Sequence, residues 1–123
     1  MLRAYEARRP VVTRVVPVMA GDRAVDAATT EIRVEFSAPM ARYTGIGFGP
    51  GGKPAYPITE RVGFSPDQRS YTVRVALQPG RAYGFVLEGG ADGGFSSADG
   101  YPLKPDTVTF TTSRAPRTAR DER

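Results

Sequence analysis

Hydrophobic and polar side chains alternate along several short stretches of this chain. The clearest is Glu31–Phe36, in which Ile32, Val34 and Phe36 fall on one side of an extended strand and three charged residues fall on the other. Residues 71–77 repeat the pattern, with apolar side chains at every second position. An amphipathic helix would need apolar residues at three- and four-residue spacing, which Glu31–Phe36 does not offer. Both stretches therefore predict half-buried β-strands.

Shorter signals predict the other strands. A β-branched run ends at Pro17, and two glycine- and proline-rich connections, residues 42–59 and 89–105, interrupt the alternation. The predicted strands cover residues 11–16, 31–36, 43–48, 61–64, 71–77, 83–87 and 106–112. About seven short strands with turn residues between them, and no convincing helix, predict an all-β fold built as one antiparallel β-sandwich.

Tyr83 stands directly after one tight turn. Pro79 fixes its own backbone angle and Gly80 supplies a turn conformation, so one strand ends before them and Tyr83 opens the next. Burial of a tyrosine ring is favourable only where the hydroxyl finds a partner, and in immunoglobulin-type sandwiches a tyrosine at this corner bonds to backbone a few residues upstream. We therefore expect Tyr83 to be a structural residue and the sandwich to be immunoglobulin-like, with Greek-key connections.

The side chains that face inward from the clear strands define the predicted core. They are Val16, Ile32, Val34, Phe36, Val73, Val75, Tyr83, Phe85, Val108 and Phe110. Residues 20–23 have the composition of a turn, after which Val25 is expected to plug the core. Met40, after the strand that ends at Phe36, is expected to fold back as a flexible core filler.

The length of 123 residues predicts a single domain, and charge divides it into three parts. We expect residues 1–9 to be a flank or linker, residues 10–113 to form the sandwich, and residues 114–123 to be a disordered basic tail. The net charge of +4 comes from the two flanks, at +2 each, so the central part sums to zero. A nucleic-acid-binding domain carries its positive excess on a folded face, so no nucleic-acid partner is expected.

Composition excludes several kinds of chemistry. The chain has no cysteine and no histidine, which excludes disulfides, zinc–thiolate sites and nucleophiles activated by histidine. A pair of carboxylates is conceivable, but Glu31 and Glu35 lie beside Arg33 on what is expected to be a solvated face. We therefore expect no enzyme activity and no cofactor.

No apolar run approaches the roughly 18 residues of a membrane span, so no membrane insertion is expected. The first nine residues lack the apolar segment of a secretory signal. The chain is then expected to be either cytoplasmic or a fragment of a longer exported protein.

Aromatic residues in the two long connections are the candidate ligand contacts. They are Tyr43, Phe48 and Tyr56 in residues 42–59, with Phe95 and Tyr101 in residues 89–105. Two interpretations stay open: exposed rings would serve as platforms for a glycan or a peptide, whereas rings packed beneath their own loops would be structural.

Acidic residues raise the question of calcium, which prefers oxygen ligands. The weak candidates are Asp92, Asp99 and Asp106, with Asp22 and Asp26 as a second group. Asp-Gly is also ordinary turn chemistry, and the Asp-x-Asp-x-Asp-Gly spacing of a calcium loop is absent. We expect no metal site.

Longer motifs resemble a known family. Val16-Pro17, a following Gly-Asp turn and the run from Glu31 to Met40 are similar to the opening of the bacterial Ig-like domain named after the S-layer protein SbsA. The later matching features are Ser65-Pro66-Asp67, Leu77-Gln78-Pro79-Gly80-Arg81-Ala82-Tyr83, Asp99-Gly100-Tyr101-Pro102-Leu103 and Phe110-Thr111-Thr112. The resemblance extends from Val11 to Thr112.

This resemblance implies a module of bacterial envelope or secreted proteins, which acts as a spacer or sits beside catalytic or glycan-binding domains. The family has no shared catalytic residues to carry over. We therefore expect a non-catalytic structural or interaction module at the cell surface or secreted, whose partner is a neighbouring domain or another envelope protein. The alternative is a glycan- or peptide-binding module that uses the aromatic residues of the two long connections.

Overall fold

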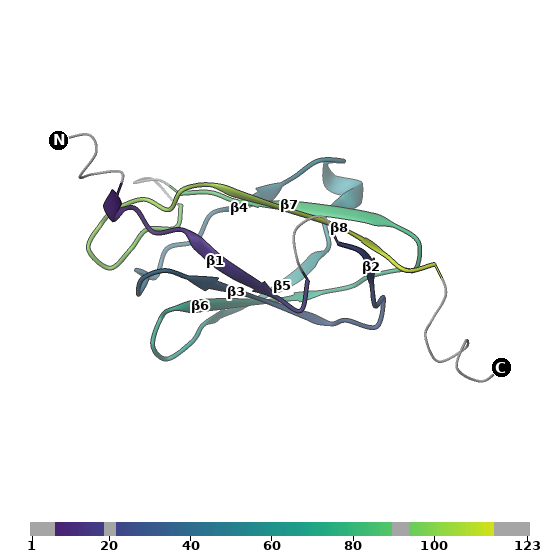
Figure 1. Ribbon diagram of the computed structural model, residues 1–123, viewed down its shortest axis with the longest axis horizontal. Helices are drawn as coiled ribbons and strands as arrows, with labels where there is room; N and C mark the ends of the chain where they lie inside the picture. The colour runs from purple at the N-terminus through teal and green to yellow at the C-terminus, as the bar shows by residue number, and fades with distance from the viewer. Residues whose placement is uncertain (1–6, 19–21, 90–93, 115–123) are drawn as a thin grey trace.

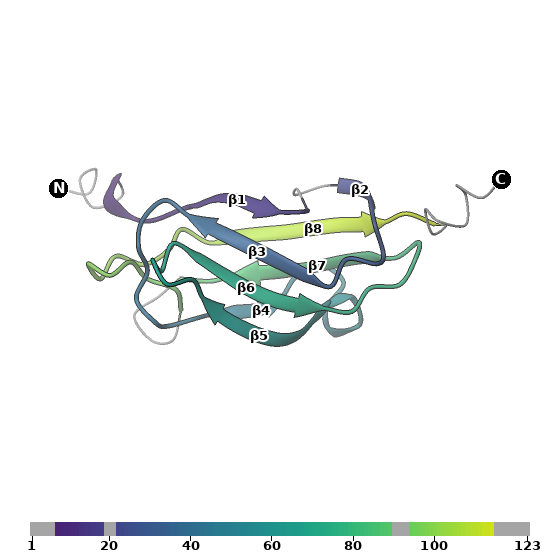
Figure 2. The ribbon, with the colours of Figure 1, turned by 90° about the horizontal axis from the view of Figure 1, so that it is seen from below.

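Two four-stranded β-sheets pack face to face in the computed structural model, which describes residues 7–18, 22–89 and 94–114 (Figures 1 and 2). The first sheet has the order β1 (Val12–Val16), β3 (Glu31–Phe36), β6 (Ser70–Val75) and β5 (Ile58–Phe64). The second sheet has the order β2 (Asp22–Val25), β8 (Asp106–Thr112), β7 (Ala82–Leu87) and β4 (Ile46–Phe48). A 3₁₀ turn, η1 (Lys53–Ala55), lies between β4 and β5. Apart from β2, this is the strand order of an immunoglobulin constant-type sandwich, so the predicted fold class is confirmed.

The strand β2 corrects two predictions. Its first two residues, Asp22 and Arg23, were expected to belong to a turn, and every strand pairing was expected to be antiparallel. Instead β2 runs parallel to β8, with Asp22 opposite Phe110 and Val25 opposite Thr112. Val25 is buried, as predicted, and its carbonyl accepts the N–H of Ser113 at 2.9 Å. The strand is too short for an alternation to be visible beside the Gly-Asp pair, which is typical of turns.

Strand boundaries follow the pattern closely where the alternation is regular. β3 and β8 have the predicted bounds. β4 begins at Ile46 rather than at residue 43, and β5 begins at Ile58 rather than at residue 61. The register of β5 against β6 shifts twice, between Ile58 and Glu60 and again between Arg61 and Gly63. Each shift breaks the period of two, which is why the first half of β5 escaped prediction.

Nine of the ten predicted core residues are buried, and Val16 is the exception. Val16 is half-buried, whereas Val12 and Val15 pack against the core. The register of β1 against β3 shifts between Val12 and Arg14, so an extra residue reverses which side of the strand faces inward. Met40 fills the core as expected.

The chain passes through the molecule from one end to the other. Figure 1 shows the described residues beginning at one end of the longest axis and β8 leading out at the other. At the first end, Arg9 donates to the carbonyls of Pro102 and Leu103 at 3.1 and 3.2 Å, and Pro10 accepts the N–H of Lys104. The entry of the chain is therefore fixed to residues 102–104. Within the described residues no helix is long and apolar enough to cross a membrane.

Candidate functional site

Tyr83, in β7, contacts the turn that connects β6 to β7. Tyr83 is 6% exposed, and its ring stacks on Phe110 with ring centroids 5.6 Å apart. Its hydroxyl accepts the backbone N–H of Gln78 at 2.8 Å, which is the arrangement expected of a tyrosine corner. The guanidinium carbon of the exposed Arg81 lies 5.7 Å from the centroid of the Tyr83 ring. These contacts give Tyr83 a structural role.

The same turn is tied to the last strand by Thr112. Its buried hydroxyl donates to the carbonyl of Gln78 at 2.5 Å and accepts the N–H of Arg81 at 3.0 Å. Both backbone groups of the turn thereby find a partner away from water. Sequence reasoning missed this role of Thr112, because a hydroxyl in a β-strand gives no signal of the turn that it meets in the fold.

The five candidate aromatic residues do not form one surface. Phe95 is fully buried, with ring centroids 5.4 Å from Phe36, 5.6 Å from Tyr71 and 6.1 Å from Phe64. It is a core residue that offers no face to a ligand. Tyr101 is half-buried near the entry of the chain, where Arg8 lies 3.5 Å from its hydroxyl.

The aromatic residues of the first connection remain accessible. Tyr43 is 64% exposed and Phe48 is 56% exposed. Phe48 lies edge-to-face with the half-buried Tyr56, at 5.1 Å between centroids. The register puts Phe48 opposite the buried Phe85 and hence on the inner face of the second sheet. Because β4 is an edge strand, Phe48 nevertheless reaches solvent.

The carboxylates weighed for catalysis make ion pairs on an outer face. Glu35 lies 2.9 Å from Arg33, and Glu31 lies 3.8 Å from Arg74, which also lies 3.5 Å from Glu60. All of these side chains are at least 30% exposed. Such pairs contribute little to stability and present no enclosed pair of carboxyls.

Asp67 serves the predicted hairpin turn between β5 and β6. Its carboxylate accepts the Ser65 hydroxyl at 2.6 Å and the Arg69 N–H at 3.1 Å. These hydrogen bonds, with that of Ser65 first, lower the pKa of Asp67. The carboxylate is held ionised by a local turn.

The calcium candidates are dispersed. Asp92 and the side chain of Asp22 lie outside the described residues. Asp26 accepts the N–H of Ala28 at 2.9 Å in a local turn, and Asp99 is exposed. Among the described residues, no three acidic side chains come together in a way that could hold a metal ion.

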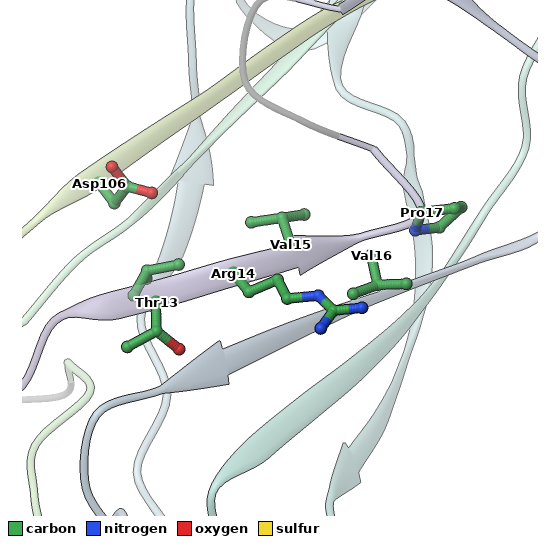
Figure 3. A pocket seen from close by; sticks show the side chains of 7 residues that line it. Thr13, Arg14, Val15, Val16, Pro17 and Asp106 are labelled. Carbon is green, nitrogen blue, oxygen red and sulfur yellow. The ribbon is translucent and has the colours of Figure 1, made fainter.

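Asp106 instead lines a groove that the sequence did not predict. The groove has a volume of about 500 Å³ and runs between β1 and β8 (Figure 3). One wall is the whole of β1 with Pro17, and Asp106 faces it from the start of β8. Figure 3 shows Val15 directed from β1 towards β8, while the Arg14 side chain extends away from Asp106. The β1 side of the groove thus combines valines with Thr13 and Arg14, and the β8 side contributes the acidic Asp106.

Burial raises the pKa of Asp106, because removal from water disfavours the ionised carboxylate. No hydrogen bond or ion pair from another described residue offsets that cost for the Asp106 side chain. The sequence could flag Asp106 as an acidic residue near a loop. It could not show the groove, which exists because β1 pairs with β3 while β2 pairs with β8.

Solved structures with the same fold include CopC from Methylosinus trichosporium OB3b. That structure is 18% identical in sequence, with a TM-score of 0.63 over 85% of this chain and 93% of CopC. Domains 1–6 of the surface layer protein SbsC match with 22% identity and a TM-score of 0.55, and residues 31–844 of recombinant SbsC with 24% and 0.52. Each SbsC match covers 93% of this chain but only 15% of the SbsC chain in that structure.

These likenesses show the fold. No family model matches the chain, and no curated protein matches it in sequence. The chain is a β-sandwich similar in structure to domains of an S-layer protein and to CopC.

Proposed function

We propose that this chain is a non-catalytic Ig-like module of the SbsA type, which serves as a spacer or interaction domain in a larger bacterial surface or secreted protein. The observation that carries the proposal is the path of the chain, which enters at one end of the long axis and leaves at the other (Figure 1). Domains with this geometry can follow one another in a row, each adding its own length.

Two further observations support a structural role. The SbsC structures contain a similar domain within a much longer chain, of which this domain spans 15%. Of the side chains that sequence analysis singled out for chemistry, Glu31 and Glu35 make surface ion pairs, Asp26 serves a local turn and Phe95 packs in the core. The partners that suit such a module are a neighbouring domain of a longer chain or another envelope protein.

Labelling of intact cells tests this proposal. The chain has two lysines, of which Lys53 is exposed in η1. A membrane-impermeant amine reagent should therefore label the protein on intact cells of the organism that produces it. A cytoplasmic protein from the same cells is the control. If Lys53 reacts only after the cells are lysed and the protein is absent from the medium, the envelope role is wrong.

The exposed aromatic pair favours a second candidate function. Phe48 and Tyr56 present an edge-to-face pair, and Tyr43 of the same connection is accessible. Such rings suit the apolar faces of sugars or an extended peptide. A glycan array with the full chain, with and without calcium, tests this candidate. Binding that Phe48→Ala removes and Val62→Ala retains would support it, since Val62 is an equally exposed apolar residue on β5.

A further inference from the structure

The outer edge of β8 is covered along only half its length. β2 pairs with the half from Phe110 to Thr112, and in the described structure no strand pairs with the outer side of the half that begins at Asp106. β1 faces this first half across the groove (Figure 2), but β1 pairs with β3 in the other sheet. An unpaired strand edge is a template for another extended chain.

Backbone directions identify the free groups. Thr112 donates its N–H to Arg81 on the β7 side, and Ser113 donates its N–H to Val25 on the β2 side. Because these directions alternate along a strand, Thr107 turns its N–H and C=O to the same outer side as Ser113. Thr107 is exposed, and it directly follows Asp106, which lines the groove.

The groove has room and chemistry for an extended segment. A strand along residues 106–109 is about 13 Å long, at roughly 3.3 Å per residue. Alternate side chains of an added strand would meet Val12 and Val15, which are half-buried and line the groove. Asp106 adds a carboxylate whose burial is not offset by a cation in the described structure.

We propose that the groove between β1 and β8 binds an extended segment of another polypeptide, which adds to the outer edge of β8 at Thr107 in line with β2 and places a lysine or arginine against Asp106. The inference rests on the proposed function, since it gives the interaction module its docking surface. Backbone hydrogen bonds supply affinity in this mode, and the basic side chain selects the segment.

The position of the existing edge strand favours a separate segment over a second copy docked by its own β1. The register shift between Val12 and Arg14 twists β1, and Pro17 ends it, and both features oppose pairing of two β1 edges. The unpaired part of β8, from Asp106 to Thr109, keeps a regular register against β7 and contains no proline.

Amide chemical shifts of the isotope-labelled full chain test the proposal. The probes are two synthetic peptides, acetyl-Gly-Thr-Val-Lys-Val-Thr-Gly-amide and its counterpart with glutamate in place of lysine. Titration to about 5 mM should shift the amides of Thr107 and of β1, with the lysine peptide binding about three- to tenfold more tightly. Shifts confined to β4 or β5, or no shift at all, would overturn the proposal.

Two variants separate the backbone and charge contributions. Thr107→Pro removes an outward N–H without removing a bond to β7, so it should abolish peptide binding while the fold is retained. Asp106→Asn should bring the two peptides to equal affinity, whereas Asp99→Asn, an exposed control, should leave the preference unchanged. Retained binding in Thr107→Pro, or a lysine preference that survives Asp106→Asn, would contradict the proposal.

Sedimentation of the unlabelled chain tests whether a second copy of the chain, rather than a separate segment, occupies the groove. Self-association that Thr107→Pro removes would identify a second copy as the occupant and would overturn a separate segment. The outcome is independent of the location of the protein in cells. A surface protein that binds neither peptide would lose this inference and keep its role as a spacer.

Discussion

The hydroxyl of Tyr83 accepts the backbone N–H of Gln78 at 2.8 Å, across the turn that links the two sheets. The donor is a main-chain group that no β-ladder reaches, since Gln78 lies outside the strands. One side chain thereby satisfies the turn while its ring fills the core against Phe110.

Tyr83→Phe is expected to destabilise the domain by roughly 1–3 kcal/mol, because it leaves the Gln78 N–H without its partner but keeps the ring buried. Tyr83→Ala should cost roughly 3–5 kcal/mol, as for other buried aromatic residues. Denaturant unfolding measures both. Tyr101→Phe is the control, since the contact of its hydroxyl with Arg8, at 3.5 Å, is exposed. Unchanged midpoints for both Tyr83 variants would show that the corner contributes nothing.

Phe95→Ala is expected to destabilise the domain by roughly 3–5 kcal/mol, because the ring is fully buried among Phe36, Phe64 and Tyr71. Tyr43→Ala should stay within about 0.5 kcal/mol of the original chain, since Tyr43 lies on the surface. Thermal unfolding of the two variants compares them directly. A small effect at Phe95 would mean that residues 94–103 do not close the core in solution.

Arg9→Ala is expected to cost about 1–3 kcal/mol, because the guanidinium donates to the carbonyls of Pro102 and Leu103. Arg8→Ala is the matched control and should have little effect, since Arg8 is exposed. Hydrogen exchange at Lys104, whose N–H is bonded to Pro10, reports on the same attachment. Equal effects of the two substitutions would contradict the attachment of the N-terminal entry by Arg9.

Asp106→Asn is expected to raise the melting temperature at pH 7. Burial raises the pKa of Asp106, so the folded state binds the proton more tightly than the unfolded state, and stability falls as pH rises through the raised folded pKa. The gain should vanish at about pH 2, where Asp106 is protonated in both states. Asp99→Asn, at an exposed position, is the control. A loss of stability on Asp106→Asn at pH 7 would mean that the carboxylate already has a stabilising partner.

Residues with a strict period of two gave the most accurate predictions. Ile32, Val34 and Phe36 are buried because a strand with one covered face must place alternate side chains inward. The same reasoning was wrong for β1. One extra residue near Thr13 reverses the alternation, so Val15 rather than Val16 packs against the core. A register shift is decided by the partner strand and has no signature in the strand itself.

The candidate site was harder to predict for a related reason. Phe95 and Tyr101 lie in the same glycine-rich connection, yet Phe95 closes the core and Tyr101 reaches the surface. Their burial depends on how residues 94–103 fold against Met40 and Pro10, which are distant in the sequence. The groove beside Asp106 likewise arises from the division of the N-terminal strands between two sheets.

The most direct test of the spacer role is the length of a tandem array. One, two and three copies of the full chain, joined head to tail, are compared by small-angle X-ray scattering. Because the chain enters and leaves at opposite ends of the long axis, the maximum dimension should grow by a similar increment with each added copy. A maximum dimension that rises only slightly from one copy to three, as for copies folded back on one another, would contradict the account.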